Sequence, residues 1–320
     1  MKSQVSVIIP SYNRADTLPK AVESVLLQSS VEVEVIIIDD GSTDSTESDA
    51  KELLDFWGSS VKYFRQPNLE RSRARNNGIR LSKFNLVAFL DSDDIWLPNH
   101  LETCVEIITQ NPGIIGAFSD FEYIDRQIKQ NRSKLHKTHF DSVEFSKRLC
   151  VMDALIHPSR LVLDRSAVEN ILFDERIPGC EDWVLIAQLL TKGQILPTNK
   201  STVLMRQSLD GTFGQTDKFK KSVELAARLI IDSGLPGLVS VPAWRVLATG
   251  KLQCAYVDYL AGNKLSGVLN LLESIRVNAK VVIWRRFWIV LIRLLIPKRA
   301  TTTLRKLARK QYGLAKGNSL

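Results

Sequence analysis

Cysteine is scarce in this chain of 320 residues, and its spacing excludes two kinds of site. The four cysteines, Cys104, Cys150, Cys180 and Cys254, lie far apart and form no C-x-x-C pair. A disulfide framework is typical of short, cysteine-dense chains and a structural zinc site of paired cysteines, so neither is indicated, and we expect a reducing, cytoplasmic setting. The opening residues MKSQVSVIIP also lack the apolar core and small-residue cleavage site of a signal peptide, and they predict a strand.

Acidic residues are missing from the C-terminal end. Residues 274–320 contain 12 Lys and Arg and no Asp or Glu, whereas the rest of the chain has 31 Lys and Arg and 35 Asp and Glu, within a formal net charge of +8. A nucleic-acid-binding protein would carry a basic groove through its folded body, so we expect no nucleic acid as the main partner. A basic end is typical of a protein that rests on an anionic membrane surface.

Uncharged apolar runs are too short to cross a bilayer. The most apolar segment, residues 281–297, contains three arginines. On a helical wheel the arginines fall on one side and large apolar side chains on the other, which predicts a helix lying in the plane of a membrane interface. A helix that packs on the protein itself or in a dimer would show the same pattern, so this alternative and the oligomeric state stay open. The charged side has Arg285, Arg286 and Arg293, the apolar side has Trp284, Phe287, Trp288, Leu291, Leu294 and Leu295, and the basic residues beyond are Lys298, Arg299, Arg305, Lys306, Arg309 and Lys310.

Strand-like and helical segments alternate through the first half of the chain. This alternation is typical of an α/β fold with a Rossmann-like, mostly parallel sheet flanked by helices. Residues 125–150, which include His136 and His139, are polar and predict a loop. We expect one domain at residues 1–217 and a helical C-terminal region at 218–320. The expected strands are 5–10, 33–38, 61–65, 86–90 and 114–121, and the expected helices are 16–28, 45 onward, 71–82 and 97–109.

Three carboxylates follow the apolar strand at residues 86–90. Asp91 and Asp93 are two positions apart, so both can point toward one hard cation at the carboxyl end of the strand, where open parallel sheets bind ligands. This pattern predicts a site for Mn²⁺ or Mg²⁺. The alternative is a polar turn in which Asp94 caps the next helix.

Four motifs occur in order and in register: VSVIIPSYNR, EVIIIDDGSTDST, N-x-E-R-S-R-A-R-N-N-G-I and FLDSDD. Together they resemble the N-terminal half of a family 2 glycosyltransferase with the GT-A fold, over roughly residues 4–215. The resemblance implies an inverting enzyme that transfers a sugar from a nucleotide-sugar donor, most often a UDP-sugar, to a saccharide or lipid-linked acceptor. It also implies a divalent cation at Asp91 and Asp93.

The resemblance assigns a donor site to these motifs. Tyr12 could stack on the nucleobase, or pack as an ordinary loop aromatic. Asp40 could accept a hydrogen bond from the base while Asp39 orients the turn, and both could equally cap the next helix. Arg71 and Arg75 share a helical face and could reach the diphosphate or the acidic site, or form a solvated basic face. The full expected set is Pro10, Tyr12, Asp39, Asp40, Arg71, Arg75, Ser92 and Arg206.

An acidic motif, Cys180-Glu181-Asp182-Trp183, opens a predicted helix. Inverting transfer needs a base that takes the proton from the acceptor hydroxyl, and Asp182 is the candidate. The alternative is that both acids only compensate the helix dipole.

Three positions depart from the pattern of similar proteins. Glu70 stands where they carry Gly, Ile171-Leu172 replaces Gly-Gly, and Ser208 replaces a His that serves as a metal ligand. The third metal ligand therefore stays open.

Two other functions compete with this interpretation. A nucleotidyltransferase that makes nucleotide sugars would carry a Gly-rich phosphate loop after the first strand, where this chain has SYNR. A catalytically silent, membrane-bound scaffold is favoured only by Ser208. We therefore expect an inverting glycosyltransferase of cell-surface polysaccharide synthesis, cytoplasmic and peripheral on the inner face of the membrane.

Overall fold

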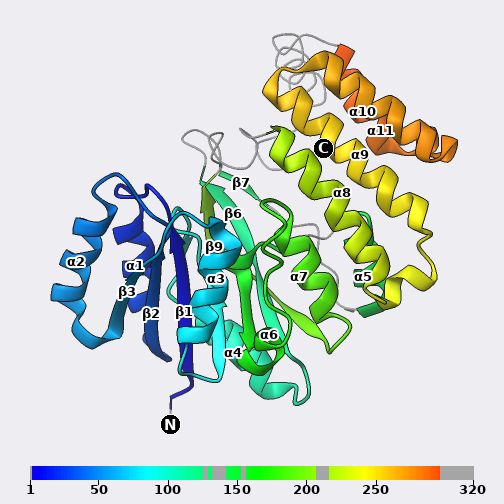
Figure 1. Ribbon diagram of the computed structural model, residues 1–320. Helices are drawn as coiled ribbons and strands as arrows, with labels where there is room; N and C mark the ends of the chain where they lie inside the picture. The colour runs from blue at the N-terminus through cyan, green and yellow to red at the C-terminus, as the bar shows by residue number, and fades with distance from the viewer. Residues whose placement is uncertain (1, 125–128, 132–141, 153–155, 207–215, 296–320) are drawn as a thin grey trace, which may run out of the picture. The chain divides into compact units, whose positions relative to one another are not determined.

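The computed structural model describes residues 2–124, 129–131, 142–152, 156–206 and 216–295 (Figure 1). The chain forms two compact units. The first comprises residues 1–208 and 229–240, and the second comprises residues 209–228 and 241–320. The first unit is discontinuous in sequence, because it includes a segment from beyond residue 217. The expected domain boundary at residue 217 stays a prediction.

A nine-stranded mixed sheet forms the centre of the first unit, in the order β3-β2-β1-β4-β8-β6-β9-β5 with β7 paired to β6. The longest ladders, β1 with β2 and β6 with β9, are parallel, whereas β8 runs antiparallel to both β4 and β6. This confirms the expected mixed, mostly parallel sheet flanked by helices. The strands are β1 (Gln4–Ser11), β2 (Glu32–Asp39), β3 (Val61–Arg65), β4 (Leu86–Phe89), β5 (Ile95–Trp96), β6 (Gly116–Ile124), β7 (Lys129–Asn131), β8 (Leu161–Asp164) and β9 (Ile195–Arg206).

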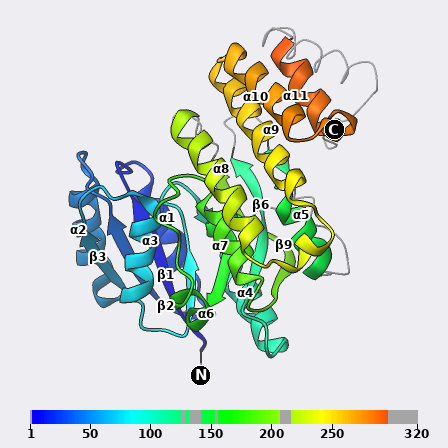
Figure 2. The same ribbon diagram turned by 45° about the vertical axis from the view of Figure 1, so that its right-hand side comes forward.

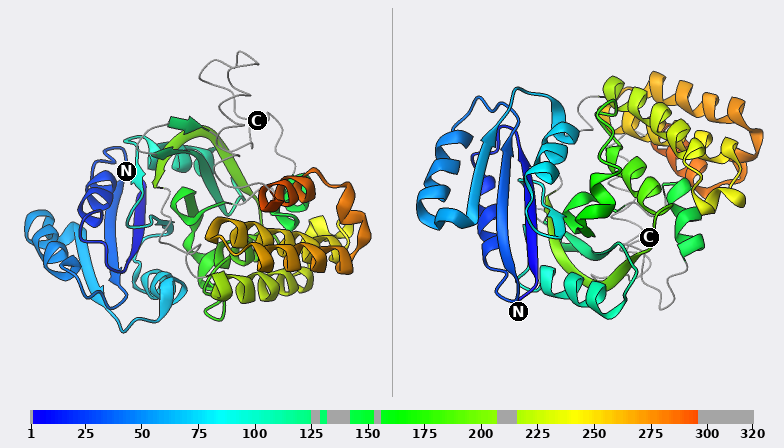
Figure 3. Two further views of the ribbon diagram at one scale, coloured as in Figure 1. Left: turned by 90° about the horizontal axis from the view of Figure 1, so that it is seen from above. Right: turned by 60° about the horizontal axis from the view of Figure 1, so that its bottom comes forward.

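Helices cover both faces of the sheet, which explains why β2 is continuously apolar from Val35 to Ile38. Val35 and Ile37 of β2 join the large core beneath α1 and α2, whereas Ile36 and Ile38 point to the other face and pack with Ala74 of α3. Figures 2 and 3 show this layered arrangement from other sides. The helices of this unit are α1 (Leu18–Leu26), α2 (Thr46–Trp57), α3 (Glu70–Leu81), α4 (His100–Gln110), α5 (Ser142–Cys150), α6 (Arg165–Glu169) and α7 (Glu181–Leu189), and short 3-10 turns lie at η1 (Gly58–Ser60), η2 (Pro158–Arg160) and η4 (Pro236–Val239).

Two local predictions were wrong. The helix expected from residue 97 begins at His100, because Ile95 and Trp96 first pair with β9 as the short strand β5. The loop expected at 125–150 contains the helix α5, whose Phe145 and Leu149 are buried. These two apolar residues are four positions apart, which is the spacing of one helical face. His136 and His139 lie outside the described residues.

The second unit is helical throughout the residues that the structure describes, which agrees with the expected appendage. It contains α9 (Ala243–Ala261), α10 (Lys264–Val277), η5 (Ala279–Ile283), α11 (Arg285–Leu295) and most of α8 (Thr216–Asp232). Its core includes Leu252 of α9, Leu271 of α10 and Leu294 of α11, all buried. Among the described residues, the helices are too short or too polar to cross a bilayer.

Some apolar residues of the helix α11 are buried in the protein and others are exposed to solvent. Phe287 and Leu294 pack into the core of the second unit, whereas Trp288, Ile292 and Leu295 are 50%, 49% and 66% exposed. The helix therefore packs on the protein along one side and keeps an apolar strip open on another.

Two of its arginines are turned toward α9. Arg286 hydrogen-bonds to Gln253, and the guanidinium of Arg293 lies 5.0 Å from the ring centroid of Tyr256. These two arginines therefore have polar and aromatic partners on α9, which agrees with the alternative of a helix that packs on the protein itself along this side.

Candidate functional site

A buried arginine joins two acidic segments at the carboxyl end of β4. Arg75 of α3 is 1% exposed, and its Nη2 donates to Asp91 Oδ1 at 2.7 Å while its Nη1 donates to Glu181 Oε1 at 2.8 Å. Helix α3 approaches β1 closely because Gly78 has no side chain; a Cβ there would lie 2.3 Å from Ile8 Cγ2. This close packing brings Arg75 from the helix to the end of the strand.

The charge of Arg75 sets the ionisation of both partners. Burial alone would raise the pKa of Asp91, but the nearby guanidinium of Arg75 outweighs it and holds this pKa below its usual range. Burial also acts to raise the pKa of Glu181, and the charges of Arg71 and Arg75 together lower it. Arg71 Nε lies 3.6 Å from Glu181 Oε1. Both arginines therefore face the acidic site, which was one of the two roles expected for them.

Asp182 lies beside this network, in the first turn of α7. Its Oδ1 accepts the backbone N–H of Trp183 at 2.8 Å. Burial, followed by the negative charge of Glu181, raises the pKa of Asp182 to about 7. A carboxylate with a pKa near neutrality can take up a proton during a reaction at that pH, which is the property required of a general base. Its assignment as the catalytic base stays a prediction.

The motif around Arg75 also holds the segment that leads to α7. The side chain of Asn76 donates to the carbonyl of Phe173 and accepts from its N–H, both at 2.9 Å. Leu172, the residue before, has a left-handed backbone with φ +56°, and Glu70 at the start of α3 has φ +75°. These are positions where similar proteins carry glycine, so the chain keeps the glycine-favouring conformation without the glycine.

Asp93 and Asp94 have different surroundings. Asp93 Oδ2 lies 3.7 Å from Arg14 Nη2, and burial together with the charge of Asp91 raises the pKa of Asp93. Asp94 accepts from Ser159 Oγ at 2.6 Å and from the backbone N–H of Arg206 at 3.0 Å. Asp94 thus ties the loop after β4 to η2 and β9, and the alternative in which it caps the next helix is wrong.

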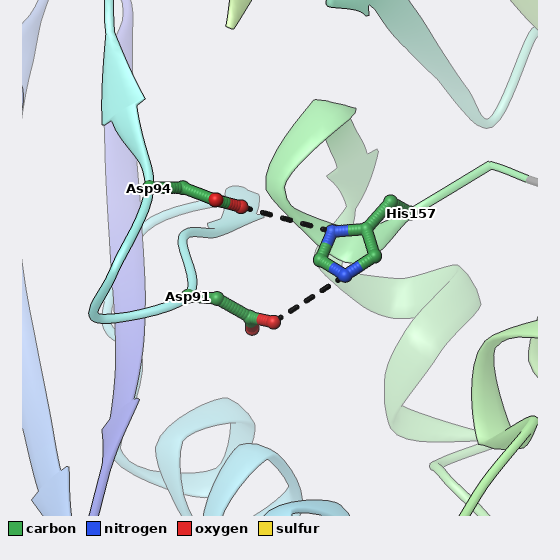
Figure 4. Close-up of side chains that lie close together, drawn as sticks. All are labelled: Asp91, Asp94 and His157. Atoms are coloured by element: carbon green, nitrogen blue, oxygen red, sulfur yellow. Dashed lines mark ion pairs between the residues drawn. The ribbon is translucent and has the colours of Figure 1, made fainter. Parts of the chain in front are cut away.

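His157 completes a group that could hold a metal ion. One ligand atom each from Asp91, Asp94 and His157 lies within 4.8 Å of the others. Figure 4 shows the imidazole facing both carboxylates: Nε2 is 3.4 Å from Asp91 Oδ2 and Nδ1 is 3.9 Å from Asp94 Oδ2. His157 Nδ1 is buried without a hydrogen-bond partner. Carboxylate and imidazole are suitable ligands for Mn²⁺, so the residues present fit a divalent cation.

Neither His157 nor the part that Glu181 takes in the network was predicted from the sequence. His157 directly precedes η2 and β8, and β8 inserts beside β4 in antiparallel orientation. The only available signal was the short HPSR turn before an apolar strand. Nothing in the spacing indicates that this strand lies next to the one that carries Asp91.

The loops after β1 and β2 carry the residues that we expect to contact the nucleotide. Asp39 is fully buried; its Oδ1 accepts from the N–H of Ser42 and its Oδ2 from the hydroxyl of Tyr63. Both oxygens of Asp39 therefore hold the turn. Asp40 accepts from Gln66 and from the N–H of Leu69, and both hydrogen bonds end on Oδ1.

The remaining expected donor residues surround these loops. Tyr12 follows β1 and is 45% exposed, as a stacking platform needs to be, and Pro10 is half-buried in β1. Ser92 is buried between the two acids, and Arg206 is exposed at the end of β9. The ligand contacts of all these residues stay predictions. Ser208 lies outside the described residues.

Comparisons with known proteins agree with this architecture. The sequence profile described as Glycosyl transferase family 2 matches residues 6–172. The Escherichia coli protein named UDP-Glc:alpha-D-GlcNAc-diphosphoundecaprenol beta-1,3-glucosyltransferase WfgD is 28% identical over 221 residues, which cover 68% of this chain and 81% of that protein. Several uncharacterised relatives from Rickettsia and Nostoc are aligned over less than two fifths of their own length, between 26% and 38%.

Solved structures show the same fold at low identity. S. aureus TarS 1-349 in complex with UDP-GlcNAc superposes with a TM-score of 0.66 and 18% identity, over 87% of this chain and 81% of that one. The mannosyltransferase PcManGT from Pyrobaculum calidifontis, in complex with GDP-Man and Mn²⁺, gives a TM-score of 0.58 at 14% identity, over 92% and 86% of the two chains.

Proposed function

Because this chain belongs to glycosyl transferase family 2, we propose that it is an inverting glycosyltransferase that moves a sugar from a UDP-sugar to a lipid-linked saccharide. The reaction would serve the synthesis of a cell-surface polysaccharide. The donor is supported by the UDP-Glc in the name of WfgD and by the UDP-GlcNAc bound to TarS. The acceptor class is supported by the diphosphoundecaprenol-linked sugar in the name of WfgD.

The observation that carries the proposal is the position of Asp182 beside the Arg75 bridge. Arg75 ties the loop of Asp91 to Glu181, and Glu181 is followed at once by Asp182, whose pKa is about 7. One buried guanidinium therefore holds both the loop of Asp91 and the residue that directly precedes Asp182. In the proposed step, the acceptor hydroxyl attacks the anomeric carbon, its proton passes to Asp182, and the bond from that carbon to the diphosphate oxygen breaks.

A divalent cation is part of the proposal, with Asp91 and Asp93 as its expected ligands. When bound, Mn²⁺ or Mg²⁺ would supply Lewis-acid stabilisation of the negative charge on the departing diphosphate. Arg71 adds positive charge on the same side through its approach to Glu181. The base and the nucleotide contacts belong to the protein chain itself.

We also assign a membrane surface to the second unit. The exposed strip of α11 combines Trp288, Ile292 and Leu295 with a segment, 274–320, that contains 12 basic and no acidic residues. Such a combination favours peripheral binding to anionic lipid on the cytoplasmic side, where a lipid-linked acceptor would be reached.

The proposal is tested by measuring UDP release from a panel of UDP-sugars with Mn²⁺ and a diphosphate-lipid-linked acceptor. We expect acceptor-dependent release with one donor and its loss in Asp182→Asn. The NMR coupling constant of the new anomeric proton then reports whether the configuration is inverted. Binding of UDP without turnover on any acceptor of this class would favour the silent scaffold instead.

A further inference from the structure

Asp91 and Asp93 are the two expected cation ligands, and the sequence offers no residue for a third. Similar proteins carry a histidine at the position that Ser208 occupies in this chain. Among the described residues, a different histidine lies at the acidic site, and it comes from another part of the chain. His157, the residue before η2, has its Nε2 3.4 Å from Asp91 Oδ2.

From this geometry we infer that His157 coordinates the divalent cation of the donor complex through Nε2, next to Asp91 Oδ2. The inference rests on the proposed function, because that function provides the cation. Two ligand atoms that are each about 2.1 Å from an ion and at right angles to one another lie about 3 Å apart. The 3.4 Å between His157 Nε2 and Asp91 Oδ2 is close to this separation.

The other contacts of Asp91 leave this oxygen available. Arg75 donates to Oδ1 at 2.7 Å, so the carboxylate can present Oδ2 as a single-oxygen ligand while Oδ1 keeps its partner. The buried guanidinium fixes the orientation of the carboxylate. Asp91 thus offers a preset ligand rather than a flexible one.

Asp94 faces the second ring nitrogen of His157. A metal-bound histidine usually donates its second ring N–H to a carboxylate, which fixes the tautomer and the ring plane. His157 Nδ1 is buried and lacks a hydrogen-bond partner, and Asp94 Oδ2 faces it at 3.9 Å. Each ring nitrogen therefore has its own carboxylate, as Figure 4 shows, and Asp94 is a positioning residue rather than a third ligand.

An imidazole ligand also sets the choice of metal. Mg²⁺ prefers oxygen ligands and keeps several waters, whereas imidazole nitrogen suits transition metals. We therefore expect tighter binding of Mn²⁺ than of Mg²⁺ in the presence of UDP. His157→Asn should weaken Mn²⁺ binding by roughly tenfold or more, and Asp94→Asn should weaken it less.

The direct test is electron spin-echo modulation of Mn²⁺ in its complex with UDP and the full-length protein. Wild-type protein should show nitrogen modulation from a coordinated imidazole, and protein labelled with ¹⁵N-histidine should show the corresponding change of frequency. The modulation should vanish in His157→Asn and His157→Gln, and should persist in the control His136→Asn. Circular dichroism and thermal unfolding establish that each variant is folded.

The outcomes separate the inference from the proposed function. Metal-dependent UDP binding without histidine modulation in the wild type, or with modulation that survives both substitutions of His157, would overturn the ligand assignment and leave the transferase intact. Absence of metal-dependent UDP binding in the wild type would overturn both.

Discussion

Arg75 Nη2 lies 2.7 Å from Asp91 Oδ1, and this contact joins the third helix of the sheet domain to the end of its central strand. The same guanidinium continues to Glu181, 106 positions later in the chain. A buried arginine placed between two carboxylates compensates both charges at once, whereas loss of the arginine would leave Glu181 with only the more distant Arg71, at 3.6 Å, and Asp91 without a guanidinium. The contact therefore serves both the stability of the domain and the geometry of the site.

The first prediction concerns Arg75→Lys. A lysine has one ammonium group and cannot bridge two carboxylates in the forked geometry of a guanidinium. We expect the variant to lose roughly 3 kcal/mol of unfolding free energy, which is typical for a broken buried ion pair. Urea denaturation measures the change, and UDP binding should fall in parallel because Asp91 is no longer held.

A suitable control is Arg73→Lys on the same helix. Arg73 pairs with Glu175 at 2.6 Å, and its side chain is 45% exposed. An exposed pair contributes about 1 kcal/mol at most, so this variant should unfold close to the wild type. If the two variants unfolded at the same urea concentration, the buried Arg75 bridge would contribute no more to stability than the exposed Arg73 pair.

The second prediction is that Asp182→Asn gains stability while it loses turnover. The folded protein raises the pKa of Asp182 from 3.8 to about 7, so it holds the proton more tightly than the unfolded chain does. Stability is therefore unaffected below about pH 4, falls as the pH rises toward 7, and carries the full penalty above 7. Asparagine removes this penalty, and we expect a gain of at least about 1 kcal/mol at pH 8 and none at pH 3.5.

Turnover of the same variant should fall by about 10²- to 10⁴-fold, the usual contribution of a general base. Binding of UDP with Mn²⁺ should stay within a factor of a few, since Asp182 is assigned to the acceptor rather than the donor. A variant that is destabilised at pH 8 would show that the carboxylate is needed for folding and would contradict the assignment.

The third prediction is the pH dependence of the wild-type enzyme. If Asp182 takes the proton of the acceptor, kcat/KM should rise about tenfold per pH unit below 7 and level off above it. Glu181 raises this pKa, while the charges of Arg75 and Arg71 lower it. Arg71→Gln should therefore move the midpoint to higher pH, a shift that a purely structural Arg71 would not produce.

The sequence predicted most of the sheet and the strand ends, but not the contacts between distant segments. The apolar run of β2 and the acids that follow it, Asp39 and Asp40, could be placed because a strand buried on both faces has a continuous apolar pattern. The acids after β4 were placed by the same reasoning. His157 could not be predicted, because its position depends on the antiparallel insertion of β8 next to β4.

Two residues that depart from the family pattern have an unusual backbone conformation. Glu70 and Leu172 replace glycines of similar proteins, and both adopt positive φ, at +75° and +56°. The backbone at these two positions thus adopts a conformation that favours glycine, although neither residue is glycine. A sequence pattern indicates the residue types at such positions, whereas the strain becomes visible only in the structure.

The fourth prediction follows from this strain. A non-glycine residue in the left-handed region costs roughly 1–2 kcal/mol, while glycine adds up to about 1 kcal/mol of unfolded-state entropy. Glu70→Gly and Leu172→Gly should therefore be neutral or stabilising by up to about 1 kcal/mol. As a matched control, Glu52→Gly in the interior of α2 should destabilise the protein by about 1 kcal/mol. Thermal unfolding compares the three variants, and equal losses in all of them would contradict strain at residues 70 and 172.

The fifth prediction is binding of α11 to anionic membranes. Trp288, Ile292 and Leu295 recur at helical spacing and are each about half exposed or more, at 50%, 49% and 66%. Moving a large apolar side chain from water into a membrane interface contributes about 1.5–3 kcal/mol, so Trp288→Ser or Ile292→Ser should weaken binding by roughly tenfold or more. Sedimentation with vesicles that contain phosphatidylglycerol measures this change. Binding should also decrease with added salt, since screening weakens the attraction between basic residues and lipid headgroups.

The control for this prediction is Phe56→Ser, which removes an aromatic side chain that is 78% exposed on α2 of the first unit. General hydrophobicity would make this variant lose as much binding as Trp288→Ser, whereas docking through α11 predicts that it binds like the wild type. Neutral phosphatidylcholine vesicles should retain little of either protein, because the apolar strip alone lacks the electrostatic attraction of the basic segment. Equal binding to neutral and anionic vesicles would contradict the part assigned to the basic segment, and no effect of either α11 substitution would contradict docking through this helix.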